Sequence, residues 1–115
     1  MKTCIDETLT EIDDFFSTFT RNPLVFKAEM LSIFNESFEI FKKEIKRAIS
    51  NEDKKAALFL IHRFKSSLRS IGVSALVDIN NELEAELSEN NFSERFSKKL
   101  SKQMECIEIC LKKLS

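Results

Sequence analysis

Residues 51–71 read NEDKKAALFLIHRFKSSLRSI and carry apolar side chains at helical spacing. An α-helix turns about 100° per residue, so the apolar residues of this stretch gather within about 60° of Phe64. They are Ala57, Leu60, Ile61, Leu68 and Ile71. A stripe of this kind faces a hydrophobic core. The stretch therefore predicts an amphipathic helix whose Phe64 side is buried.

The opposite side of this helix carries His62, the only histidine of the chain. His62 falls about 160° from Phe64, so we expect its imidazole to face water. The polar neighbours on that side are Lys55, Lys65, Ser66 and Arg69. A lone surface histidine among solvated charges is most often inert, so helical geometry by itself assigns it no chemistry.

Two apolar residues, Leu58 and Phe59, also fall on the outer side, one turn before His62. Exposed apolar side chains beside an exposed histidine indicate a docking surface. The alternative is that both residues pack beneath another helix near the N-terminus.

Composition restricts the class of protein. The chain has 115 residues with one glycine and one proline, which leaves almost no turn residues for a sheet. Its 18 basic and 19 acidic residues give a net charge of -1, which does not favour binding to nucleic acid or to a membrane surface. An all-helical protein of one domain, residues 1–115, is expected.

The termini and cysteines predict a cytoplasmic protein. Acidic residues follow Met1 where a signal peptide would be apolar, and no run approaches the ~20 apolar residues of a membrane span. Three cysteines without framework spacing do not indicate disulfides. Cys106 and Cys110 are four residues apart, but the only histidine lies in another segment, so neither a metal site nor a bound cofactor is expected.

Apolar spacing divides the chain into five helices. The first lies within residues 1–22, and the second opens at Asn22 and Pro23, a helix cap and a first-turn proline, and closes at Ser50 and Asn51. The stripe of the first is Ile5, Leu9, Ile12, Phe16 and Phe19, and that of the second is Met30, Phe34, Phe38, Phe41, Ile45 and Ile49.

The third helix should end near Gly72, because glycine suits the left-handed residue that terminates helices. Ser74 is expected to cap the fourth helix, and Asn91 with Glu94 forms a capping-box pattern for the fifth. The fourth stripe is Leu76, Ile79, Leu83 and Leu87, and the fifth is Phe92, Phe96, Leu100, Met104, Ile107, Leu111 and Leu114. Short connections predict an antiparallel, up-and-down four-helix bundle over residues 23–115, with the N-terminal helix packed against it.

From Met30 to Leu114 the chain resembles the histidine-containing phosphotransfer (HPt) domains. Their motif is roughly His-x-x-Lys-Gly-Ser/Ala-Ser/Ala, then x-x-x-Gly-Ala/Val-x-x-Leu. The residues of this chain that match the motif and the helix after it are His62, Lys65, Ser67, Gly72, Val73, Leu76, Leu83 and Glu84. The motif glycine four residues after the histidine is replaced by Ser66.

The resemblance implies a phosphocarrier rather than an enzyme. His62 would accept a phosphoryl group from an aspartate of a response-regulator receiver domain and return it to another receiver, with Lys65 stabilising the transferred charge. Leu58, Phe59, Ser66 and Arg69 would contact the partner. The receiver would supply the Mg²⁺, a hybrid histidine kinase would feed the relay, and the carrier would be a free-standing monomer.

Two other classes of function stay open. A helical adaptor would bind a receiver without transferring phosphate, and Ser66 in place of glycine motivates that hypothesis. A histidine kinase also presents an exposed histidine on a helix. The single glycine of this chain leaves no glycine-rich loop for a nucleotide, which disfavours a kinase.

Overall fold

The computed structural model describes residues 4–19 and 23–114, and these residues form five helices and no strand. The helices are α1 (Cys4–Phe19), α2 (Pro23–Ser50), α3 (Lys54–Ser70), α4 (Ser74–Glu89) and α5 (Glu94–Leu114). The all-helical prediction is therefore confirmed. The expected cap Asn22 and the side chain of Phe19 lie outside what is described.

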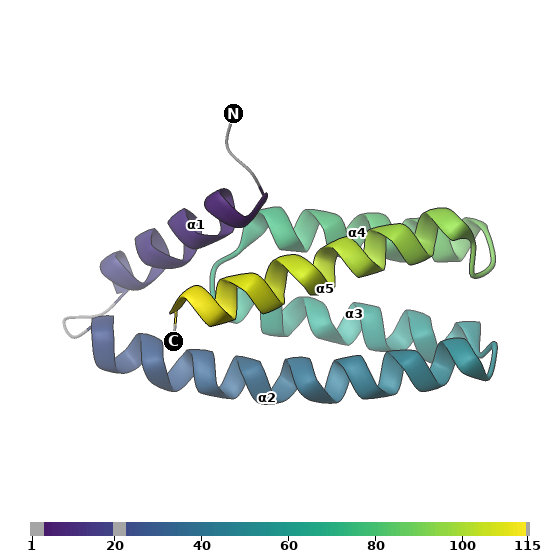
Figure 1. The fold of residues 1–115 in the computed structure, drawn as a ribbon, viewed down its shortest axis with the longest axis horizontal. Helices are drawn as coiled ribbons and strands as arrows, with labels where there is room; N and C mark the ends of the chain where they lie inside the picture. The colour runs from purple at the N-terminus through teal and green to yellow at the C-terminus, as the bar shows by residue number, and fades with distance from the viewer. Residues whose placement is uncertain (1–3, 20–22, 115) are drawn as a thin grey trace.

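Helices α2 to α5 run alternately in opposite directions and form an up-and-down bundle (Figure 1). The closest pairings are α2 with α3, α3 with α4, and α4 with α5. Helix α1 packs against α2, α4 and α5 at the end of the bundle that holds the turn between α3 and α4 (Figure 1). This is the four-helix bundle with an additional N-terminal helix that the sequence predicts.

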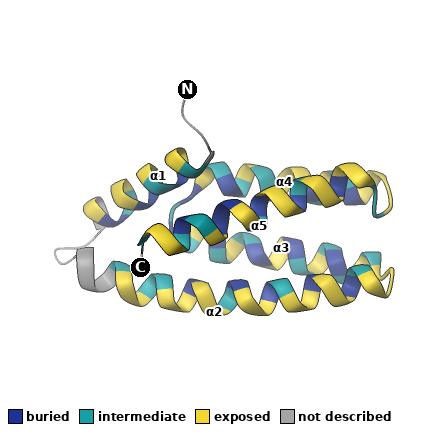
Figure 2. Cartoon of the chain, in the orientation of Figure 1, coloured by how far each residue is buried: buried dark blue, intermediate teal, exposed yellow. Residues whose placement is uncertain are grey.

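The buried faces of the helices point toward one another (Figure 2), and the described residues of all five predicted stripes are buried or half-buried. Aromatic rings hold α3 against α2. The Phe64 ring stacks on Phe41, with ring centroids 4.2 Å apart and 3° between the planes, and Phe34 and Phe38 complete the cluster. Large apolar rings contribute much of the burial in such a core, so this cluster fixes which side of α3 faces inward.

The ends of α3 follow from two local features. Asp53 caps its N-terminus, because its carboxylate accepts a hydrogen bond from the Ala56 N–H at 3.1 Å. After its C-terminus Gly72 adopts a φ of +73°, the left-handed conformation expected of the only glycine. Val73 then leads directly into α4, so α4 runs back along α3.

Two of the predicted helix caps are wrong. Ser74 is the first residue of α4, and the cap is supplied by Glu11 of α1, whose carboxylate accepts from the Ser74 hydroxyl at 2.8 Å and from the Ala75 N–H at 3.3 Å. A carboxylate accepts hydrogen bonds from the unpaired N–H groups, and its negative charge also interacts favourably with the positive end of the helix dipole.

The start of α5 also differs from the expected capping box. Ser93 provides the cap, since its hydroxyl accepts from the Phe96 N–H at 3.1 Å and donates to Glu86 at 3.2 Å. Asn91 contributes its backbone carbonyl to the turn, accepting from the Ser93 N–H. The cap of α5 is therefore Ser93, two residues after the expected Asn91, and Glu94 is the first residue of the helix.

Gly72→Ala is predicted to destabilise the fold. A left-handed conformation costs an L-residue about 1–2 kcal/mol, and a Cβ at Gly72 would lie 2.5–2.7 Å from side-chain atoms of Phe15. The free energy of unfolding, measured in urea, should fall by at least the backbone cost. The fall should be smaller in a Phe15→Ala background, which removes the Cγ and Cδ2 atoms near Gly72 and keeps the Cβ atom. An unchanged urea midpoint would contradict this account of the turn.

Candidate functional site

His62 lies in the middle of α3 on its outer side, with 68% of its side chain exposed. Phe64, two residues later, is buried in the aromatic cluster. Because neighbouring positions on a helix turn by about 100°, burial of Phe64 rotates His62 toward water. The expected exposure of this imidazole is confirmed.

A carboxylate of α4 joins His62 to Lys65. The Oε1 atom of Glu84 lies 3.4 Å from His62 Nδ1, and its Oε2 atom lies 3.6 Å from Lys65 Nζ. The side chains of Glu84 and Lys65 are only 32% and 16% exposed, so both are partly shielded from solvent. The three groups form a cluster in which one carboxylate faces an imidazole and an ammonium group.

Glu84 is the member of this cluster that the sequence analysis did not place at the site. A usable signal was present, because His62 precedes Gly72 by ten residues and Glu84 follows it by twelve. In a hairpin of two antiparallel helices, residues at similar distances from the turn lie side by side. Glu84 also follows Leu83, which is buried, and so lies at the edge of the α3–α4 contact.

This arrangement distinguishes the two nitrogens of the imidazole. A neutral histidine carries one proton, and a carboxylate near Nδ1 favours the tautomer with the proton on that atom. The lone pair then resides on the other ring nitrogen, Nε2. An exposed nitrogen lone pair is a nucleophile at neutral pH.

The other expected site residues differ in their accessibility. Ser66 and Arg69 are exposed near His62 on the surface of α3, and Phe59 is 63% exposed. Phe59 does not pack beneath another helix, which removes that alternative for it. Leu58 is half-buried and packs against the core, so its expected place on the outer surface is wrong. It lies on the side of α3 that faces α4, as Lys65 does, and α4 shields that side.

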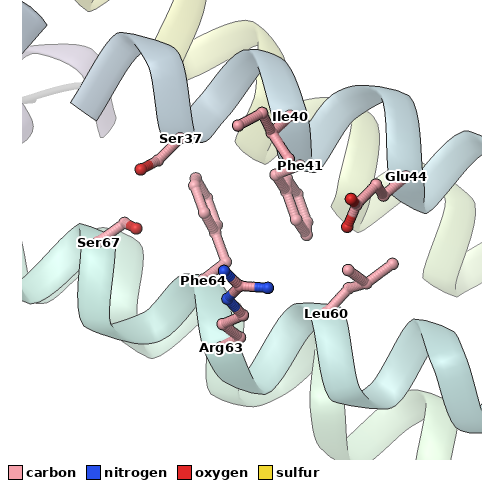
Figure 3. Close-up of a pocket in the computed structure, with 8 residues that line it drawn as sticks. All are labelled: Ser37, Ile40, Phe41, Glu44, Leu60, Arg63, Phe64 and Ser67. Atoms are coloured by element: carbon pink, nitrogen blue, oxygen red, sulfur yellow. The ribbon is translucent and has the colours of Figure 1, made fainter. Parts of the chain in front are cut away.

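A shallow groove of about 80 Å³ lies between α2 and α3, on the other flank of α3. Figure 3 shows Ile40 and Phe41 of α2 facing Leu60 and Phe64 of α3, with Arg63 beside them. The large apolar side chains that are mostly exposed in the described chain are Ile33, Ile40 and Phe59. They belong to α2 and α3, so exposed apolar surface is concentrated on these two helices.

The thiols of Cys106 and Cys110 are buried, and their sulfur atoms lie 3.8 Å from the Thr8 hydroxyl and 3.9 Å from the Ile5 carbonyl. Within residues 4–19 and 23–114, no three His, Cys, Asp or Glu side chains gather as metal ligands. None of the helices described in these ranges has the length and apolar character of a membrane span.

Comparison with known protein families gives a match that covers most of the bundle. The family model of the Hpt domain matches residues 29–114, from α2 to the end of α5. Searches of curated proteins and of solved structures gave no match. Hpt domains are phosphocarriers of phosphorelays, without catalytic activity of their own, and they work with receiver domains. The helical bundle and the family match over most of its length show that this chain belongs to the Hpt domain family.

Proposed function

We propose that this protein accepts a phosphoryl group on His62 from the aspartate of one receiver domain and passes it to the aspartate of another. The observation that carries the proposal is the exposed imidazole of α3 with a carboxylate beside its Nδ1 atom. This geometry leaves Nε2 as the accessible nucleophile within a family of histidine phosphotransfer domains.

The transfer balances as a displacement at phosphorus. The Nε2 lone pair forms the N–P bond while the O–P bond of the receiver's acyl phosphate breaks, and the aspartate leaves as a carboxylate. The Nδ1 proton stays on the ring, where the positive charge of the phosphorylated imidazole is offset by Glu84. The same steps in reverse charge a second receiver, as a relay requires.

Lys65 supplies electrostatic stabilisation to the transferred group. The equatorial oxygens of the phosphoryl group carry negative charge in a loose transition state, which a nearby cation stabilises. The ammonium group of Lys65 is held at 3.6 Å by Glu84, on the α4 side of the imidazole. Arg69, two turns after His62 and exposed, adds positive charge to the same surface.

The proposed partners are receiver domains, which bring the Mg²⁺ and the acidic pocket for the phosphoryl group, with a hybrid histidine kinase upstream. Phe59, Ser66 and Arg69 surround His62 on the exposed part of α3 and form the contact surface. Half-buried Leu58 supports that surface from beneath. In this role residues 1–115 act as one domain, as a monomer in the cytoplasm.

A second function, an adaptor that binds receivers without transfer, is favoured by Ser66. This exposed side chain stands one helical turn after His62, where the family motif has glycine. A side chain at this position narrows the space through which a receiver reaches the imidazole.

Transfer from a phosphorylated receiver tests the main proposal. Radiolabelled receiver domains from the same organism should label the wild-type protein but not His62→Gln, because the amide is no nucleophile toward an acyl phosphate. The label should be lost in acid and kept in base, as a phosphoramidate is. Ser66→Gly, which restores the motif, is the matched variant and should transfer at least as fast as wild type.

Two outcomes contradict phosphotransfer through His62. Label that persists in His62→Gln would place the phosphoryl group on another residue. Receivers that bind wild type while none of them labels it would support the adaptor, and gain of labelling in Ser66→Gly would identify the serine as the cause.

Phe59→Asp is predicted to weaken receiver binding by about tenfold, the loss of ~1.4 kcal/mol expected when an apolar contact at an interface is removed. Because Phe59 is exposed, the helical content and the melting temperature should stay close to wild type. Leu58→Asp is the matched control, because it places the same charge at a half-buried neighbour. It should lower the stability of the fold. Titration calorimetry that gives equal affinities for Phe59→Asp and wild type would remove Phe59 from the contact surface.

A further inference from the structure

Two amide side chains are buried in the bundle where α4 meets α3 and α5. Asn80 of α4 and Gln103 of α5 each have 0% of their surface exposed. Apart from these two, Thr8 is the only buried polar residue in the described chain. Polar side chains enter a core only where hydrogen bonds compensate for lost water, so their contacts require an explanation.

The amides form a chain of hydrogen bonds across three helices. Asn80 Nδ2 donates to the carbonyl of Ile61 in α3 at 2.8 Å. Gln103 Nε2 donates to Asn80 Oδ1 at 3.3 Å and to the carbonyl of Leu76 at 3.5 Å. The contact between Gln103 and Asn80 orients the Asn80 amide. Because its oxygen accepts from Gln103, its nitrogen is directed at α3.

The acceptor carbonyl belongs to the residue immediately before His62. On α4, Asn80 and Glu84 are four residues apart and therefore lie on the same side of the helix. Helix α4 thus contacts α3 twice at the level of His62. The amide of Asn80 binds the backbone from the core side, and the carboxylate of Glu84 lies 3.4 Å from the imidazole at the surface.

We propose that Asn80 and Gln103 are positioning residues that hold α3 in the register on α4 that keeps the Nδ1 atom of His62 beside Glu84. Only the expected effect on the rate of phosphoryl transfer rests on the proposed function. The position of Nδ1 beside Glu84 is a property of the unphosphorylated protein and is tested separately.

Physical chemistry explains why a polar pair serves this purpose. The other buried side chains at the α3–α4 contact are apolar, such as Ile61, Leu68 and Leu83, and their attraction depends on area and not on direction. A buried hydrogen bond is directional, and it is lost if one helix slides past the other.

The pair is not optimal for stability, because Gln103 Oε1 is buried with no hydrogen-bond partner among the described residues. An unsatisfied buried oxygen is unfavourable, and apolar side chains of similar size often replace buried polar groups without loss of stability. The property that the two amides supply is therefore a fixed register and not additional stability.

The test is nitrogen NMR of the His62 imidazole in the whole protein, together with the rate of phosphoryl transfer from a receiver. Asn80→Leu keeps the approximate size and removes the hydrogen bond to Ile61. Its Nδ1 and Nε2 resonances should move toward those of a free histidine, in the same direction as in Glu84→Gln, which removes the carboxylate itself. Transfer should slow at least threefold, while affinity for the receiver stays unchanged.

A double variant tests whether the two residues act through the same contact. If Asn80 acts through Glu84, Asn80→Leu should have little further effect on the imidazole resonances or on transfer in the Glu84→Gln background. Thr8→Val is the control, because it removes the other buried polar group, on α1, and should leave the imidazole resonances unchanged. Gln103→Met removes the orienting donor from Asn80 and should produce a smaller shift of the same kind.

The inference is overturned if folded Asn80→Leu keeps the wild-type imidazole resonances and transfer rate. If Asn80→Leu does not fold, the same measurements are made on Gln103→Met. Wild-type imidazole resonances and a wild-type transfer rate in that variant would then overturn the inference. A third outcome separates the two proposals. If wild type shows the Nδ1–H tautomer and Asn80→Leu shifts the imidazole resonances, but the protein accepts no phosphate, the proposed function is refuted and the positioning role is supported.

Discussion

The packing of Phe64 against Phe41 controls the geometry of the site. These rings lie 4.2 Å apart and nearly parallel, within a cluster that also includes Phe34 and Phe38. Burial of large rings is a major source of stability in a small bundle, so α3 has little freedom to rotate about its axis. With Phe64 directed inward, helical geometry directs His62 outward and places Lys65 on the side of α4.

The turn at Gly72 determines what His62 meets on that side. Its left-handed backbone brings α4 back along α3, and the close approach of Phe15 lets α1 pack over the turn. The same return path carries Glu84 to the imidazole and Asn80 to the carbonyl of Ile61. Helix α4 thereby gives the exposed His62 of α3 a fixed polar neighbour, Glu84.

The sequence contained enough information to predict the architecture and the exposure of His62. Apolar periodicity depends on the residues of one helix at a time, and the described residues of each of the five stripes are buried or half-buried. The position of Gly72 was equally readable, because glycine adopts the left-handed conformation at a helix end more readily than any other residue. The resemblance around His62 predicted the family, which the match to residues 29–114 confirms.

The features that the sequence analysis missed or misplaced depend on how helices meet. Glu11 caps α4 from another helix, which no local capping pattern contains. Leu58 lies at the boundary between core and surface on the helical wheel, so its burial depends on where α4 lies. The contact between Glu84 and His62 likewise requires the register of α3 on α4, which helical periodicity alone does not give.

The central claim is that His62 accepts phosphate through Nε2 while Glu84 occupies the other side of the ring. The most direct measurement is nitrogen and phosphorus NMR of the protein after it has been charged by a receiver. The account predicts a phosphorus coupling to Nε2 and a proton on Nδ1. Phosphate on Nδ1, or on a residue other than His62, would contradict it.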